Sequence, residues 1–240
     1  MALIIAPHFD DAVLSTAHVL VARRPEVTVL TVCGGVPADD SLAGWDEDCG
    51  FGSGAHAAHA RAREDRRANA LVGAESVHLT YTDSPYRSGF PAERVAADIA
   101  AALPPCGEVW IPAGIGSHPD HVATRDVVAE LLADEPGRLR FYAECPYSFL
   151  PSWSATDDER DDEHSWQEPL AELGRRIGSK RARTVWLDDE AMRLKLAMLD
   201  AHRSQAMALA KEVPGLLDFD GPLRTEVHWA GTLTRQAALS

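Results

Sequence analysis

Two short stretches of the sequence concentrate imidazole and carboxylate side chains. The side chains are His8, Asp10 and Asp11 in "PHFDD", and His118, Asp120 and His121 in "SHPDH". Two imidazoles and one carboxylate, with a fourth position left for water, form an ordinary catalytic zinc site. Such a metal lowers the pKa of its water to about 7, a second carboxylate can take the proton, and a further histidine can stabilise an oxyanion. The two stretches therefore supply every part of metal-assisted amide or ester hydrolysis.

Each stretch follows a predicted strand, the second one in a Gly-rich turn that opens a helix. The apolar runs "ALIIA" and "EVWIPA" precede the first and second stretch, and such runs are typical of strands that are covered on both faces. In open α/β sheets, ligands bind beyond the carboxyl ends of the strands. We therefore expect both clusters to meet at the same edge of one sheet, and the active site to lie there.

Strands and helices alternate along most of the chain. Further strands are predicted at "VTVLTVC", "SVHLTY", "RLRFYAEC" and, at the edge of the sheet, "TEVHWAG"; helices are predicted from residue 11, and around residues 55–73, 92–103, 121–134 and 188–209. This alternation is typical of an α/β fold, here a Rossmann-like three-layer sandwich with a mostly parallel central sheet. We expect residues 1–240 to form a single domain, with a loop excursion or lid at about 146–182.

Composition restricts the partners. The chain has 23 basic and 37 acidic residues, a formal charge of −14, which disfavours binding to a nucleic-acid backbone. The sequence holds no apolar run of the ~20 residues that a membrane span needs, and "MALIIAPHFDD" lacks the basic start of a signal peptide. The expected location is therefore the cytoplasm. The four cysteines form no CxxC pair, which disfavours a cysteine zinc site. Assembly into a homo-oligomer is left open.

Each cluster also has a purely structural interpretation. Asp10 or Asp11 could cap the helix that follows, and a lone His8 is more often a surface residue than a ligand. His118 and His121 could merely flank a helix start. The joint occurrence of both clusters, each behind a strand, favours a functional site.

At these residues the sequence resembles a known family. "PHFDD" and "SHPDH" resemble the paired motifs of the LmbE-like family, also called the PIG-L or N-acetylglucosaminyl-phosphatidylinositol de-N-acetylase family. "RAREDRRANALVGAESVHLTYTD" resembles the family's Arg-x-x-Glu helix and the strand after it, and "KLAMLDAHRSQ" resembles its late helix. The resemblance implies a Rossmann-like fold and a zinc-dependent hydrolase that removes acyl groups, usually acetyl, from amino sugars and related compounds.

The resemblance also implies a role for each matching residue. The implied roles are zinc ligands for His8, Asp11 and His121; general base for Asp10; polarisation or protonation of the tetrahedral intermediate for His118; orientation of a neighbouring histidine for Asp120; and substrate contacts for Arg61 and Asp83. Arg61 could instead be a surface helix residue, and Asp83 a turn residue. The expected partner is a small N-acylated amino sugar or glycosylated metabolite. The expected cofactor is Zn²⁺, with Fe²⁺ as another divalent metal for the same site.

Departures from the family pattern leave some alternatives open. Phe9 stands between His8 and Asp10, and Ala12 replaces a glutamate found in many members. An amidase of a larger sugar–thiol or natural-product conjugate would use the same metal and base. A non-haem iron(II) oxygenase would need His8, Asp10 and His121 together, on a β-rich fold. A dinucleotide-binding protein is disfavoured because no G-x-G-x-x-G follows the first strand. A non-catalytic scaffold is disfavoured because Asp10 and His118 are both present.

Overall fold

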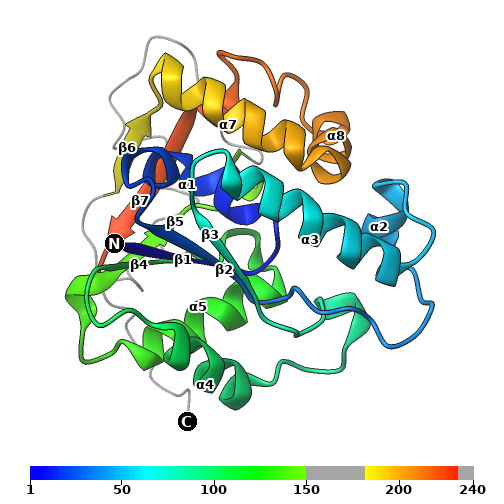
Figure 1. Cartoon of the computed structure of the whole chain (residues 1–240), viewed down its shortest axis with the longest axis horizontal. Helices are drawn as coiled ribbons and strands as arrows, with labels where there is room; N and C mark the ends of the chain where they lie inside the picture. The colour runs from blue at the N-terminus through cyan, green and yellow to red at the C-terminus, as the bar shows by residue number, and fades with distance from the viewer. Residues whose placement is uncertain (150–181, 232–240) are drawn as a thin grey trace.

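The fold is built around β1 (Ala2–Ala6), whose five residues are all buried. This computed structural model describes residues 1–149 and 182–231, which form one seven-stranded sheet in the order β3-β2-β1-β4-β5-β7-β6 (Figure 1). The other strands are β2 (Val27–Thr31), β3 (Glu75–His78), β4 (Glu108–Pro112), β5 (Leu139–Tyr142), β6 (Arg183–Trp186) and β7 (Thr225–Ala230). Strands β1 to β5 run parallel. Strand β7 is antiparallel to both of its neighbours, β5 and β6, so the sheet is mostly parallel as predicted.

Helices cover both faces of the sheet, which gives the predicted three layers. One face carries α1 (Asp11–Ala22), α3 (Gly54–Ala70), α7 (Asp189–Ala201) and α8 (Arg203–Glu212), and the other carries α4 (Ala92–Ala102) and α5 (Pro119–Leu131) (Figure 1). Side chains alternate along a strand, so Ile4 packs into the core under α1 and α7 while Ile5 packs into the core under α4 and α5. Among the described residues, none of the helices is both long and apolar enough to cross a bilayer.

Three parts of the chain differ from the sequence-based predictions. "TEVHWAG" is not at the sheet edge, because β6 pairs with β7 and lies outside it. The single late helix is interrupted at His202 and becomes α7 and α8. A short helix, α2 (Gly44–Asp48), lies between β2 and α3, where no helix was predicted. The excursion predicted at about 146–182 falls outside the described residues except for positions 146–149 and 182.

Helix α1 contains a break that the C-terminal strand stabilises. Thr16 has non-helical backbone angles, φ −138° and ψ 26°. The break frees the N–H groups of Ala17 and His18, and both donate to the Glu226 carboxylate on β7 at 2.9 Å. The buried Lys195 ammonium lies 2.7 Å from the same carboxylate and balances its charge. The carboxylate thus caps the N-terminal end of the second part of α1, and an acidic group is favoured at the N-terminal end of a helix.

Candidate metal centre and active site

The "PHFDD" turn joins β1 to α1 and folds back on itself. The His8 backbone N–H donates to Asp11 Oδ2 at 2.8 Å, which holds the two side chains on the same side of the turn. Asp10 occupies the N-cap position of α1, but its side chain makes no capping hydrogen bond. Its carboxylate is buried and lines a cavity instead. Helix capping therefore does not account for Asp10.

The "SHPDH" turn joins β4 to α5. Gly116 has a φ of +77°, and a Cβ there would lie 2.5 Å from the Tyr147 ring, so a glycine is needed on both counts. His118 then caps α5, because its Nδ1 accepts from the Asp120 backbone N–H at 3.3 Å. Pro119 occupies the first turn of the helix, where its missing N–H costs nothing. The turn therefore fixes the direction of the histidines on either side of Pro119.

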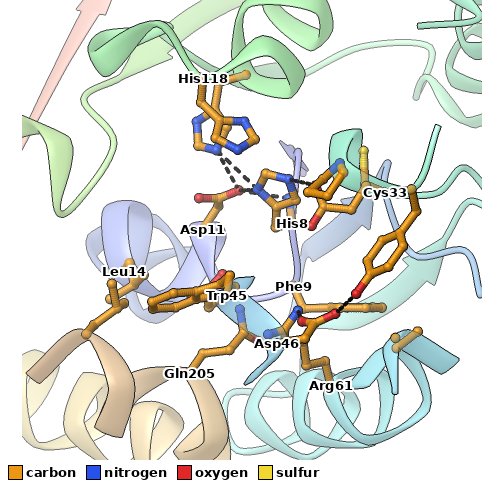
Figure 2. Close-up of a pocket in the computed structure, with 18 of the residues that line it drawn as sticks. His8, Phe9, Asp11, Leu14, Cys33, Trp45, Asp46, Arg61, His118 and Gln205 are labelled. Atoms are coloured by element: carbon orange, nitrogen blue, oxygen red, sulfur yellow. Dashed lines mark hydrogen bonds and ion pairs between the residues drawn. The ribbon is translucent and has the colours of Figure 1, made fainter. Parts of the chain in front are cut away.

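The two turns bring three potential ligand atoms together. His8 Nδ1 lies 3.2 Å from His121 Nε2 and 3.4 Å from Asp11 Oδ2, and the last two atoms are also 3.4 Å apart. Ligands at roughly 2.0–2.2 Å from a tetrahedral zinc ion lie about 3.4 Å from one another. The ring of His118 packs edge-on against His8, 4.9 Å away, and Figure 2 shows both beside Asp11. Two imidazoles and one carboxylate at this spacing fit a divalent metal ion.

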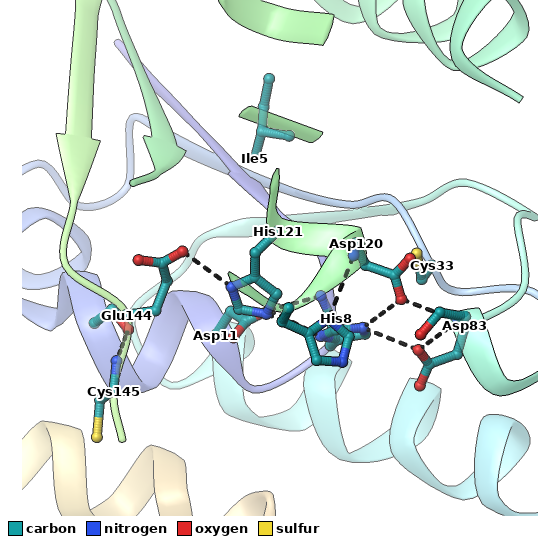
Figure 3. A network of polar contacts seen from close by, with 12 residues as sticks. Ile5, His8, Asp11, Cys33, Asp83, Asp120, His121, Glu144 and Cys145 are labelled. Atoms are coloured by element: carbon teal, nitrogen blue, oxygen red, sulfur yellow. Dashed lines mark hydrogen bonds and ion pairs between the residues drawn. The ribbon is translucent and has the colours of Figure 1, made fainter. Parts of the chain in front are cut away.

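Further carboxylates orient both imidazole rings. Glu144, just after β5, lies 3.1 Å from His121 Nδ1 (Figure 3). On the other ring, His8 Nε2 lies 3.1 Å from Asp83 Oδ1 and 3.2 Å from Asp120 Oδ2. Because carboxylates accept hydrogen bonds, this network assigns the protons to His121 Nδ1 and His8 Nε2. His8 Nδ1 and His121 Nε2 then carry no proton. These two nitrogens lie close to each other and to Asp11, as metal ligation requires.

Neighbouring carboxylates outweigh burial in their effect on the pKa values of two histidines of the centre. Burial lowers the pKa of His8, but Asp83 and the neighbouring carboxylates more than reverse this and raise it well above its usual value. In the same way, burial lowers the pKa of His121, and Asp11 and Glu144 raise it. Histidines that favour their charged form despite burial indicate a site that attracts cations. Burial and the charge of Asp11 raise the pKa of Asp10 to about 6.

The centre opens into a cavity of about 340 Å³, within the range of roughly 300–1,000 Å³ that is usual for small-molecule sites. Asp10, His118 and His121 line it, and Figure 2 shows Arg61 and Gln205 on the side away from His118. One nitrogen of the buried Arg61 side chain, Nη1, lies 2.5 Å from Asp46 Oδ1. The Cys49 thiol lies near the guanidinium group. Arg61 Nε and Nη2 and Gln205 Oε1 are buried without a hydrogen-bond partner among the described residues.

A contact between α3 and α8 explains why Arg61 and Gln205 line the same cavity. Glu64, one turn after Arg61, accepts hydrogen bonds from the Ser204 hydroxyl at 2.5 Å and from its backbone N–H at 3.3 Å. The carboxylate therefore caps the start of α8. Gln205 is the next residue, and the "RARE" and "HRSQ" motifs thus meet at the cavity.

A family comparison identifies the chain. The model of the GlcNAc-PI de-N-acetylase family, PIG-L, matches residues 3–132, more than half of the 240 residues and both turns described above. The chain belongs to the PIG-L family. This confirms the resemblance seen in the sequence, and it makes the protein a hydrolytic N-deacetylase by family. No curated protein matches the sequence.

Solved structures similar to this PIG-L protein include several deacetylases. The deacetylase of the antimicrobial A40926 pseudoaglycone is 24% identical, with a TM-score of 0.74 and 98% of each chain covered. A deacetylase of the teicoplanin biosynthesis pathway is 24% identical, with a TM-score of 0.77 and coverage of 98% and 99%. N,N'-diacetylchitobiose deacetylase from Pyrococcus horikoshii is 21% identical, with a TM-score of 0.52 and coverage of 90% of this chain and 74% of that chain. These likenesses confirm the predicted α/β fold.

Two further residues were candidates for substrate contacts in the PIG-L protein. Asp83 lines the cavity, and its Oδ1 is engaged by His8 and by the Ser84 backbone N–H at 2.8 Å. Arg61 is buried in the cavity wall rather than on the surface of its helix. The triad of an iron(II) oxygenase would need Asp10 with His8 and His121, whereas the structure brings Asp11 to these histidines, on an α/β fold. The geometry therefore favours the hydrolase set.

The sequence did not single out Glu144 or Arg87. Glu144 follows β5 at the same edge of the sheet, so the strand-end rule that found the other clusters could have found it as well. Arg87, whose Nη2 donates to Asp120 Oδ1, carries no comparable signal, because its position depends on the path of the turn after β3.

Proposed function

We propose that the protein is a zinc-dependent deacetylase that removes an N-acetyl group from an amino sugar or a sugar-containing metabolite. The observation that carries the proposal is the triangle of His8 Nδ1, Asp11 Oδ2 and His121 Nε2, with sides of 3.2 to 3.4 Å, at the end of a cavity lined by Asp10. These three residues would hold Zn²⁺, and Fe²⁺ would fit the same ligand set. The bound ion would supply an acidic water and a Lewis acid for the amide carbonyl.

Asp10 would act as the general base. It is buried in the cavity wall with a pKa raised to about 6, close to the range in which a base works well near neutral pH. Its carboxylate would take a proton from the attacking water and deliver it to the departing amine nitrogen. Acetate and a primary amine would result, with the proton count balanced.

His118 would stabilise the oxyanion. Its Nδ1 is engaged by the Asp120 backbone N–H, so the ring proton is on Nε2. Burial, together with the charges of His8 and His121, lowers the pKa of His118. The imidazole would therefore donate a hydrogen bond as a neutral group to the amide oxygen as its negative charge develops.

The cavity wall supports a sugar as the substrate. Two Arg61 nitrogens, Nε and Nη2, and the Gln205 Oε1 acceptor have no hydrogen-bond partner among the residues that the structure describes, and together they suit sugar hydroxyls. Trp45, also in the wall, offers an apolar face. Asp83 would contact a hydroxyl with its second carboxylate oxygen. Teicoplanin in complex with a similar deacetylase, and N,N'-diacetylchitobiose as the substrate of another, support a glycosylated or amino-sugar substrate.

Acetate release tests the proposal. A panel of N-acetylated amino sugars and of glycosides bearing an N-acyl amino sugar would be incubated with purified protein, before and after chelation and after return of Zn²⁺. We expect release to be lost on chelation and restored by Zn²⁺. Full activity in rigorously metal-free protein would contradict the zinc mechanism. Cleavage of only a large conjugate would favour the alternative of an amidase, which uses the same centre.

A further inference from the structure

Arg87 is held rigidly in the turn after β3. Its Nη1 donates to the Thr82 carbonyl, its Nε donates to the Gly89 carbonyl at 3.0 Å, and its Nη2 donates to Asp120 Oδ1. The guanidinium carbon also lies 5.0 Å from the centre of the Phe90 ring, over its face. Each nitrogen of the guanidinium therefore has a protein partner, and stacking fixes its plane.

Asp120 connects this arginine to the candidate metal centre. The Asp120 side chain is fully buried, and its two oxygens face opposite partners. Oδ1 accepts from Arg87, whereas Oδ2 accepts from the Ser84 backbone N–H at 3.0 Å and lies 3.2 Å from His8 Nε2. A buried carboxylate needs a charged partner with good geometry, and Arg87 supplies a permanent positive charge.

We propose that Arg87 is a positioning residue that acts through Asp120 to fix the tautomer and direction of His8. With Oδ1 occupied by Arg87, Oδ2 remains an acceptor for the His8 Nε2 proton. The His8 Nδ1 lone pair is then directed to the point shared with Asp11 and His121. This inference rests on the proposed metal centre, because it assigns Arg87 a role in how that centre binds its ion.

A substrate contact does not explain Arg87. The side chain lies behind Asp120 and does not line the cavity that holds Asp10, Arg61 and Gln205. Its donors are already engaged by Thr82, Gly89 and Asp120. An anionic substrate group would have to displace these partners, so Arg87 serves the centre rather than the ligand.

Zn²⁺ affinity of the full chain, measured by competition with a chromophoric chelator, tests the role of Arg87. We expect Arg87→Met to weaken Zn²⁺ binding about tenfold, as loss of a supporting hydrogen bond to a ligand does elsewhere. Arg87→Lys, which keeps the charge but loses the planar fork, should give an intermediate loss. Arg138 is a matched control, since it also donates to two backbone carbonyls and one carboxylate, those of Gly107, Pro104 and Glu135. Arg138→Met should leave the Zn²⁺ affinity within about twofold.

Imidazole ¹⁵N NMR of the metal-free protein gives a second readout that a merely structural role would not change. At an alkaline pH, where the His8 ring is neutral, the parent and Arg138→Met should show a single His8 tautomer protonated on Nε2, and Arg87→Met should show a mixture of the two tautomers. Parental Zn²⁺ affinity and an unchanged His8 signal in Arg87→Met would overturn this inference alone. A parent chain that binds no divalent metal would overturn the proposed function as well. If Arg87→Met fails to fold, Arg87→Lys decides by the same two measurements.

Discussion

His121 Nε2 lies 3.2 Å from His8 Nδ1, although 113 residues separate the two histidines in the chain. Each histidine follows a strand, and the two strands, β1 and β4, are neighbours that pair in parallel, with Ala2 opposite Glu108 and Ile4 opposite Trp110. Because the two strands are parallel neighbours, their carboxyl ends lie side by side at the same edge of the sheet. The separation of the two imidazoles is therefore set by sheet register, with little dependence on long flexible loops.

Removing the charge of Asp10 should separate metal binding from catalysis. Asp10→Asn keeps the size of the side chain and leaves His8, Asp11 and His121 in place, but an amide cannot take a proton from water. We expect kcat for acetate release to fall by about 10²–10⁴-fold while one metal ion per chain is retained. Steady-state kinetics and metal analysis would check this, and parental activity in the variant would show that another group is the base.

Loss of an imidazole from the triangle should abolish metal binding. His121→Ala removes one of the three candidate ligands, and leaves Glu144 without its imidazole partner. We expect metal content after dialysis to fall from about one ion per chain to a small fraction of it. His59, exposed on α3, provides the control, and His59→Ala should retain its metal. Full occupancy in His121→Ala would remove His121 from the ligand set.

Arg61 should contribute to substrate binding more than to the chemical step. Arg61→Lys keeps a positive charge near Asp46 but loses the Nε and Nη2 donors, which have no hydrogen-bond partner among the described residues. A hydrogen bond from a charged group contributes about 1.5–3 kcal/mol, so KM should rise at least tenfold with a smaller change in kcat. Arg66→Lys, on the exposed side of the same helix, should leave KM unchanged. An equal KM in both variants would argue against the contact.

The buried pair of Glu226 and Lys195 should make stability depend on acid. Burial raises the pKa of Glu226, but Lys195 and His18 more than compensate and lower it to about 2 from its ordinary value of 4.5. A carboxyl with a lowered pKa contributes stability that is present above pH 4.5 and is lost as the pH falls toward 2. Denaturant unfolding of the parent should therefore show a falling free energy over this range.

Variants of the pair provide the control for that acid dependence. Glu226→Gln leaves Lys195 charged and buried, and should cost about 3–5 kcal/mol at pH 7. The double variant Glu226→Gln/Lys195→Met removes both charges, so it should recover much of that loss and show a smaller fall in acid. A single variant as stable as the parent would mean that Glu226 does not hold the broken helix α1 in place.

The sequence predicted the parts of the structure that depend on strong local patterns. Buried strands such as β1 and the polar residues at their ends were found, because apolar runs and the strand-end rule act within a few residues. β6 was not predicted, because its four residues, Arg183–Trp186, are exposed at both ends and form no apolar run. The contacts of Arg87 and Glu226 join residues 33 and 209 positions apart, so they depend on the complete fold. The catalytic and ligand roles of the clustered residues stay predictions.

The position of β7 has a consequence for the order in which the protein becomes functional during synthesis. Both candidate catalytic turns lie within the first 121 residues, yet β7, which pairs with β5 and supplies Glu226 to α1, comes from residues 225–230. A nascent chain on the ribosome thus displays both turns long before the strand that supports them has left the exit tunnel. Binding of the proposed metal ion should follow translation of β7 rather than accompany that of β1.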